Sequence, residues 1–227
     1  MLWAYIIFIV VAIVSFIIQN SLQNKFKKYS NLSIPNGMTG KDIAEKMLRD
    51  HGIYDVKVTS TSGHLTDFYN PINKTVNLSE QVYDSSNVAA AAIAAHECGH
   101  AVQHAEAYAP LTLRSKLVPV VSFASSWMQW VLLAGIIFLN TFPQLMLAGI
   151  ILFATTTLFS FITLPVEINA SQRALLWLNN AGITNHETHE PAKDALKTAA
   201  YTYVVAALGS LATLVYYILI FIGGSRR

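Results

Sequence analysis

The 227-residue sequence contains few charged side chains and a single cysteine. Asp, Glu, Lys and Arg make up 12% of the chain, about half of their share in a typical soluble domain, whereas hydrophobic residues make up 53%. The lone Cys98 excludes an intrachain disulfide, so the fold requires no oxidising compartment. The formal net charge of +2 is too small to indicate a nucleic acid as partner. This composition predicts a membrane protein.

Four apolar segments approach or exceed the roughly 18 residues that a helix needs to cross a bilayer. They are Leu2–Ile18, Leu117–Leu139, Leu145–Leu164 and Ala199–Ile222. The first segment lacks a basic start and a small-residue cleavage site, which favours a retained signal anchor over a cleaved signal peptide. No Asp, Glu, Lys, Arg or His lies inside the second or third segment, and this argues against a channel, pump or transporter.

These segments divide the sequence into five expected parts. They are transmembrane helix 1 (1–19), a cytoplasmic catalytic part (20–116), a hairpin of helices 2 and 3 (117–164), a second cytoplasmic segment (165–198), and helix 4 with the C-terminal tail (199–227). Most basic residues near the span ends lie in the second and fourth parts, and the positive-inside rule therefore places both in the cytoplasm. Arg226 and Arg227 lie on the other side and are outnumbered.

The segment Ala89–Glu106 is expected to form a helix that contains the H-E-x-x-H pattern of zinc hydrolases, from His96 to His100. The spacing of four puts the two histidines one turn apart on one face, so both imidazoles can bind one metal ion. Glu97 can then reach a metal-bound water as general base. A chance match on an ordinary amphipathic helix is the alternative. Cys98 points to another face and is expected to pack as a small side chain.

Two residues are candidates for a third ligand. Glu167, just past the third apolar segment, could complete a His₂Glu site or could equally be an interfacial charge. His104 lies one turn beyond His100, about 6 Å further along a straight helix, whereas ligand atoms around one zinc lie roughly 3–4 Å apart. We therefore favour Glu167 and expect His104 to be solvated or to lie behind the ligands. Ser171, one turn after Glu167, could orient a zinc-binding histidine.

Short elements are expected before the catalytic helix. An amphipathic helix should lie between Thr39, its N-cap, and Gly52, just past its end. Asp55–Ser60 alternates between apolar and polar residues, as a strand does, and Leu65–Tyr69 with Thr75–Leu78 predicts a hairpin. A strand beside a metal-binding helix could pair with an extended substrate, or could simply stabilise the domain.

The limits of the later helices are predicted from turn and proline signals. The catalytic helix should end near Tyr108, before Pro110. Pro165 suits the first turn of a helix or a kink. Residues 186–190, with two histidines, are expected in a solvated loop rather than at a second metal site, and Pro191 should begin the last helix.

The chain resembles the bacterial membrane zinc metallopeptidase family typified by YugP. The stretches that match are Gly63–Pro71, Val76–Glu80, Ala94–Gln103 and Pro165–Ser171. More distantly, the chain is similar to the membrane gluzincins that include the CAAX prenyl proteases and bacterial heat-shock membrane proteases. The resemblance implies a bacterial multi-pass protease of the plasma membrane whose active site faces the cytoplasm. It also implies one zinc ion per chain, with His96, His100 and Glu167 as ligands and Glu97 as base.

The sequence as a whole predicts a mainly α polytopic membrane protein with four transmembrane helices and a small zincin-like α+β cytoplasmic catalytic part. We expect a zinc metalloendopeptidase that acts on a protein or peptide and is embedded in the lipid bilayer. His64 and Arg173 are weaker candidates for stabilising the oxyanion. A zinc hydrolase of a lipid or another amide is the alternative enzyme. A membrane adaptor with a structural metal site is the non-enzymatic alternative, although such a site would not need Glu97.

Reporter fusions test the predicted orientation. A reporter fused after Asn36 should read as cytoplasmic and one fused at Pro143 as external, because basic residues bracket the catalytic segments. Paired fusions to alkaline phosphatase, which is active outside the cytoplasm, and to green fluorescent protein, which is fluorescent inside it, measure both sides. The reverse pattern at both positions would contradict the prediction.

Overall fold

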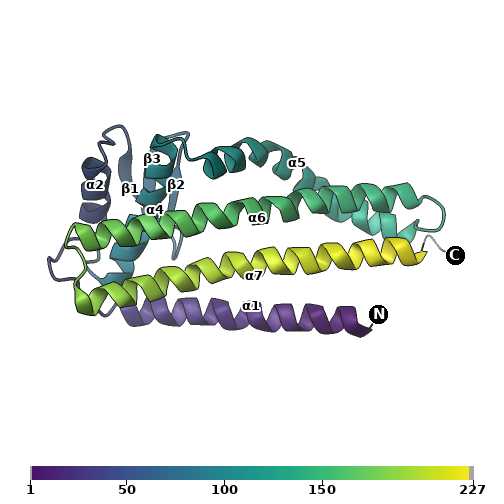
Figure 1. Ribbon diagram of the computed structural model, residues 1–227, viewed down its shortest axis with the longest axis horizontal. Helices are drawn as coiled ribbons and strands as arrows, with labels where there is room; N and C mark the ends of the chain where they lie inside the picture. The colour runs from purple at the N-terminus through teal and green to yellow at the C-terminus, as the bar shows by residue number, and fades with distance from the viewer. Residues whose placement is uncertain (1, 225–227) are drawn as a thin grey trace. The chain divides into compact units, whose positions relative to one another are not determined.

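The computed structural model describes residues 2–224, which are mainly helical; Arg226 and Arg227 lie outside this range. The helices are α1 Leu2–Tyr29, α2 Gly40–Asp50, α3 Glu80–Tyr83, α4 Val88–Ala105, α5 Ala109–Ile137, α6 Pro143–Asn180 and α7 His186–Gly224. The strands are β1 Lys57–Thr61, β2 Phe68–Asn70 and β3 Thr75–Ser79 (Figure 1).

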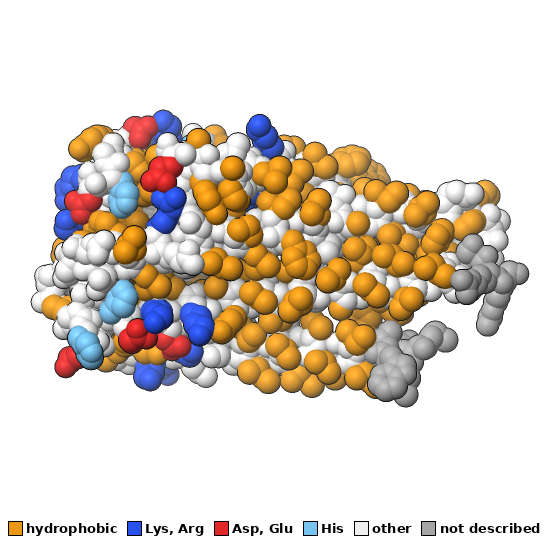
Figure 2. Space-filling model, viewed as in Figure 1, with side chains coloured by type: hydrophobic (Ala, Val, Ile, Leu, Met, Phe, Trp, Pro, Cys, Tyr) orange, Lys and Arg blue, Asp and Glu red, His pale blue; other side chains and the backbone are white. Residues whose placement is uncertain are grey.

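The chain forms two compact units. Of the described residues, 2–17, Thr112–Leu164 and 202–224 belong to the first unit, and Ile18–Leu111 and Pro165–Tyr201 belong to the second. On the face drawn in Figure 2, the helices of the first unit present mostly hydrophobic side chains, whereas charged and histidine side chains gather over the second unit. The second unit contains the sheet, α2, α3 and α4, and it also contains all the residues of the predicted metal site.

Four helices, α1, α5, α6 and α7, are long and apolar enough to cross a membrane. In the first unit they expose large hydrophobic side chains, such as Phe16, Phe123, Trp130, Ile151 and Leu208. Water solvates such continuous apolar surface poorly, whereas the hydrocarbon core of a bilayer solvates it well. The predicted class is therefore confirmed: the chain is a mainly helical membrane protein with four candidate spans.

Helices α5 and α6 pack closely within the first unit, as the predicted hairpin requires. They are joined by a short turn in which the N–H of Thr141 donates to the carbonyl of Phe138, at 3.0 Å. A Cβ atom on Gly135 would lie 2.6 Å from the Cα of Met146, so only glycine permits this approach. Small residues allow membrane helices to pack backbone to backbone in this way.

Helix α2 begins at a reciprocal cap, as predicted. The N–H of Asp42 donates to Thr39 Oγ1 at 3.2 Å, and the N–H of Thr39 donates to Asp42 Oδ2 at 2.9 Å. A hydrogen bond from the Thr39 hydroxyl to Asp42 Oδ2, at 2.7 Å, and the one from the Thr39 N–H lower the pKa of the Asp42 carboxyl. The helix buries one face, which includes Ile43 and Met47, in the core that it shares with α4. Gly52, just past the end of the helix, has a φ of 71°.

The three strands form one small sheet in the order β1-β3-β2. Strands β2 and β3 pair in antiparallel fashion with Asn70 opposite Thr75, which confirms the predicted hairpin. Strand β1 pairs with β3 in parallel, with Lys57 opposite Thr75, a pairing that the sequence pattern did not reveal. Strand β2 is thus an edge strand, and it lies against α4.

Two predictions about helix limits need correction. Helix α4 ends at Ala105, three residues before the expected end, because Ala107 adopts a left-handed φ of 51°. Pro110 then lies in the first turn of α5, where a missing N–H costs little. The placement of Pro165 in a first helical turn is wrong, since it lies inside the continuous helix α6.

The loop expected at residues 186–190 is also wrong, because α7 begins at His186. Asn185 caps this helix: its Oδ1 accepts from the N–H of Glu187 at 3.0 Å and from the N–H of Thr188 at 2.9 Å. The cap satisfies two donors that the first turn leaves without partners. Pro191 therefore lies inside the helix rather than at its start.

Candidate metal centre

Helix α4 supplies the two histidines and the glutamate of the H-E-x-x-H pattern. Its first turn is capped by Asn87, whose side chain accepts from the N–H of Ala90 at 2.9 Å. The alanines that follow favour a helix and are buried in the core next to α2. The rings of His96 and His100 consequently lie one turn apart, with 4.9 Å between their centroids.

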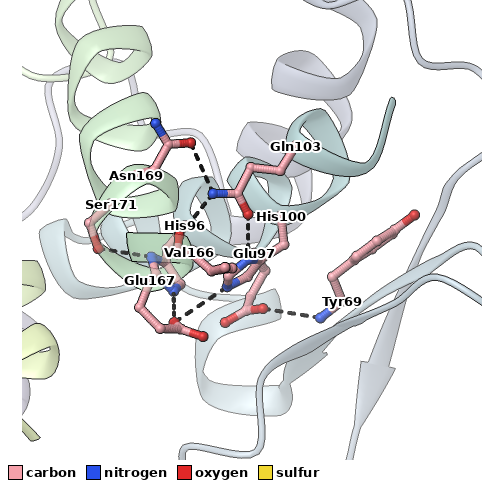
Figure 3. Close-up of polar contacts among 9 residues, drawn as sticks. All are labelled: Tyr69, His96, Glu97, His100, Gln103, Val166, Glu167, Asn169 and Ser171. Carbon is pink, nitrogen blue, oxygen red and sulfur yellow. Dashed lines mark hydrogen bonds and ion pairs between the residues drawn. The ribbon is translucent and has the colours of Figure 1, made fainter. Parts of the chain in front are cut away.

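Helix α6 brings Glu167 to both histidines. Its Oε2 lies 3.3 Å from Nε2 of His96 and 3.5 Å from Nε2 of His100 (Figure 3). Glu167 is only 3% exposed. One possible ligand atom from each residue lies within 4.8 Å of the others, and within residues 2–224 no other group of three His, Cys, Asp or Glu side chains meets in this way. The structure thus brings together the three side chains that the sequence predicts as metal ligands.

The close approach of α4 and α6 depends on Gly99. A Cβ atom at this position would lie 2.7 Å from the carbonyl oxygen of Ala170, which is closer than two such atoms can come. Ala170 and Ala174 present small buried side chains on the same part of α6. Without a side chain at Gly99, the main chains can approach closely enough for Glu167 to reach the imidazoles on the neighbouring helix.

Each imidazole is hydrogen-bonded on the side opposite to Glu167. Nδ1 of His96 lies 3.1 Å from Ser171 Oγ, and Nδ1 of His100 lies 3.1 Å from Gln103 Oε1 (Figure 3). These contacts leave both Nε2 atoms directed toward the carboxylate. The structure therefore places Ser171 beside a histidine, where an orienting group would have to be.

The donor set fits zinc. Two imidazole nitrogens and one carboxylate oxygen are ligands that zinc accepts, and the N–O separations of 3.3 and 3.5 Å match the roughly 3–4 Å between ligands of one tetrahedral ion. A His₂Glu set also leaves a coordination position open. Cys98, in contrast, is buried with its Sγ 3.6 Å from the carbonyl of Ala44, as expected for a small packed side chain.

Glu97 is held by the edge strand of the sheet. Its Oε2 accepts a hydrogen bond from the main-chain N–H of Tyr69 at 3.0 Å (Figure 3). Burial raises the pKa of the Glu97 carboxyl. A carboxyl with a raised pKa is better matched to accepting a proton and returning it near neutral pH. The side chain of the expected base thus reaches from the histidine helix α4 to the main chain of β2.

The remaining candidates have other partners. His104 is exposed, and its Nδ1 lies 2.8 Å from the hydroxyl of Tyr69. Arg173 is paired with Glu106, with 2.6 Å between Nη1 and Oε2. His64 packs edge-to-face against Phe26, with 5.2 Å between ring centroids. None of these three contacts involves the histidine and glutamate cluster.

Sequence reasoning missed three residues that surround the cluster: Gln103, Asn169 and the main chain of Tyr69. Gln103 could have been found, because it is a polar residue three positions after His100 and so lies on the same face of a helix with a largely apolar surface. The contact made by the N–H of Tyr69 left no such signal, since a main-chain N–H does not depend on which side chain the residue carries.

Comparison with known proteins shows the family of the chain. The family model described as "Putative neutral zinc metallopeptidase" matches residues 4–222. The chain belongs to this family. "Putative membrane protease YugP" of Bacillus subtilis is 41% identical to it over 210 residues, which cover 92% of each chain. The predicted resemblance is thereby confirmed, and no solved structure matches the chain.

The variant Gly99→Ala should lower both the zinc content and the stability of this zinc metallopeptidase family member. The added Cβ must push α6 away from α4, which removes Glu167 from the imidazoles and costs about 1–3 kcal/mol of stability, as overpacking does. Zinc content of purified protein and thermal unfolding measure the two effects. Gly223→Ala is the matched control, because nothing lies within 4 Å of a Cβ built there. Equal zinc content in the two variants would contradict the account.

Proposed function

We propose that this protein is a membrane zinc endopeptidase that hydrolyses peptide bonds with an activated water molecule. The observation that supports this best is the meeting of His96, His100 and Glu167 beside Glu97, in a chain of the zinc metallopeptidase family. The Bacillus subtilis relative is named a membrane protease, and we extend that activity to this chain. The chemistry that such a donor set supports is hydrolysis, since it leaves one coordination position open for water.

His96, His100 and Glu167 would together hold one zinc ion per chain. When bound, zinc supplies Lewis-acid activation of a water molecule and of the scissile carbonyl. The hydrogen bonds between Nδ1 of the two imidazoles and the side chains of Ser171 and Gln103 would keep both rings in place. Burial of the cluster between α4 and α6 would limit the competition of bulk water for the charged groups.

Glu97 would act first as general base and then as general acid. Its carboxylate would take a proton from the attacking water and return it to the amine nitrogen as the C–N bond breaks. The hydrogen bond from the N–H of Tyr69 holds the carboxylate in one orientation for both transfers.

An extended peptide would add alongside the edge strand β2. The N–H of Tyr69 donates to Glu97 rather than to β3, so the main chain of this residue faces away from the sheet. Its carbonyl oxygen is then the acceptor that a substrate N–H would meet. Pairing through the main chain tolerates many side chains, which suits an endopeptidase of broad specificity.

We further propose that the site acts at the cytoplasmic face of a bacterial cell membrane. Three lysines lie near the end of the first candidate span, Lys25, Lys27 and Lys28, and two basic residues lie near the start of the second, Arg114 and Lys116. Basic residues at span ends favour the cytoplasmic side.

The variant Glu97→Gln should retain zinc and lose peptidase activity. The substitution removes the base but none of the three ligands, and loss of general acid–base catalysis costs about 10²–10⁴-fold in rate. Cell membranes incubated with purified protein, followed by labelling of new peptide amino termini and mass spectrometry, measure cleavage. Glu80→Gln, at an exposed position on α3, is the control and should cleave like the wild type. Cleavage by Glu97→Gln at the wild-type rate would contradict the mechanism.

The third ligand is tested by comparing Glu167→Ala with His104→Ala. Zinc content per chain should fall sharply in the first variant and stay close to the wild type in the second, because His104 is exposed and bonded to Tyr69. Glu167→Gln, which keeps the shape of the side chain but removes its charge, should also lose zinc. The opposite ranking of the two alanine variants would overturn the assignment.

A further inference from the structure

Gln103 is a fully buried polar side chain that joins the two helices bearing the cluster. Its Oε1 lies 3.1 Å from Nδ1 of His100, on its own helix. Its Nε2 lies 2.8 Å from the carbonyl oxygen of Val166 and 2.9 Å from Oδ1 of Asn169, both on α6 (Figure 3). Val166 directly precedes Glu167. One side chain therefore contacts a histidine of the cluster and the backbone next to its glutamate.

The hydrogen bonds of Gln103 have only one consistent direction. The carbonyl oxygen of Val166 can only accept, so the amide group of Gln103 must donate to it. Asn169 Oδ1 also accepts from Nε of Arg173, at 2.7 Å, and an arginine has no acceptor. The NH₂ group of Gln103 thus donates to α6, and the carbonyl oxygen of Gln103 therefore faces His100.

A carbonyl oxygen facing His100 fixes the tautomer of that ring. Since Oε1 of Gln103 cannot donate, Nδ1 of His100 must provide the hydrogen. A neutral imidazole has only one N–H, and Nε2 therefore presents its lone pair toward Glu167. His96 differs in this respect, because the hydroxyl of Ser171 can donate or accept and so leaves both tautomers open.

We propose that Gln103 is a positioning residue that holds His100 in the metal-binding tautomer and anchors α6 beside the third ligand. The inference rests on the proposed function, since it assigns a metal to the cluster. It adds a chain of hydrogen bonds that reaches the cluster from α6: His100 donates to Gln103, and both Gln103 and Arg173 donate to Asn169. Partners behind metal-bound histidines set ligand orientation and basicity in this way.

Two substitutions at Gln103 separate the role in the tautomer from a purely structural one. Gln103→Met keeps the length of the side chain but removes both functions. Gln103→Glu keeps an acceptor for Nδ1 of His100 but removes the NH₂ group that binds α6. Zinc affinity, measured by competition with a chromophoric chelator, should fall about 10- to 100-fold in Gln103→Met and should fall clearly less in Gln103→Glu, which loses the contact with α6 but keeps the acceptor for His100.

Equal losses of affinity in the two variants would overturn the proposal, since they would mean that Gln103 only clamps the helices. Undiminished affinity in Gln103→Met would overturn it as well. Glu106→Gln is the control: it breaks the ion pair with Arg173 without touching Gln103 or His100, and should bind zinc like the wild type. Absence of zinc from the wild type would instead overturn the proposed function, and the inference with it.

A measurement on the unaltered protein covers the case in which a variant does not fold. Nitrogen NMR of zinc-loaded protein labelled at histidine should show His100 coordinated through Nε2, with a hydrogen-bonded proton on Nδ1. Coordination of His100 through Nδ1 would overturn the proposal, whatever its effect on activity.

Discussion

The close contact between α4 and α6 is the constraint on which the site depends. Two histidines four residues apart share one face of a helix, but the same helix cannot supply a third ligand without a break. The third group must come from a second helix whose axis passes near the first, and Gly99 against the carbonyl of Ala170 permits this. The same contact lets Gln103 reach Val166 and lets Glu106 pair with Arg173.

Burial of Gln103 and of the outer nitrogens of the two histidines is compatible with stability because each of these groups meets a partner. A buried amide or imidazole without a hydrogen bond costs several kcal/mol, by order of magnitude, so a polar cluster in an apolar core must be closed by mutual contacts. Ser171 and Gln103 satisfy the outer nitrogens of the two histidines, and Asn169 continues the chain to Arg173, whose guanidinium is partly exposed. The site is thus a layer of polar contacts between α4 and α6 rather than an isolated ligand set.

Local signals in the sequence predicted much of this arrangement. The cap at Thr39, the hairpin of β2 and β3 and the four apolar helices follow from spacing and residue type, and the structure agrees with each. The start of α7 was predicted at Pro191 because proline is typical of a first helical turn, whereas the helix begins at His186, after the cap at Asn185. The parallel pairing of β1 with β3 and the contact from Tyr69 to Glu97 connect segments distant in sequence, and no local pattern encodes them.

X-ray absorption at the zinc edge of the purified protein tests the central claim most directly. The account predicts a coordination sphere of nitrogen and oxygen only, with ligands at about 2.0–2.2 Å and the outer scattering of two imidazoles. A sulfur ligand at about 2.3 Å would contradict it; Cys98, the single cysteine of the chain, is the thiolate that could provide one. A third imidazole in place of the carboxylate oxygen would contradict it equally.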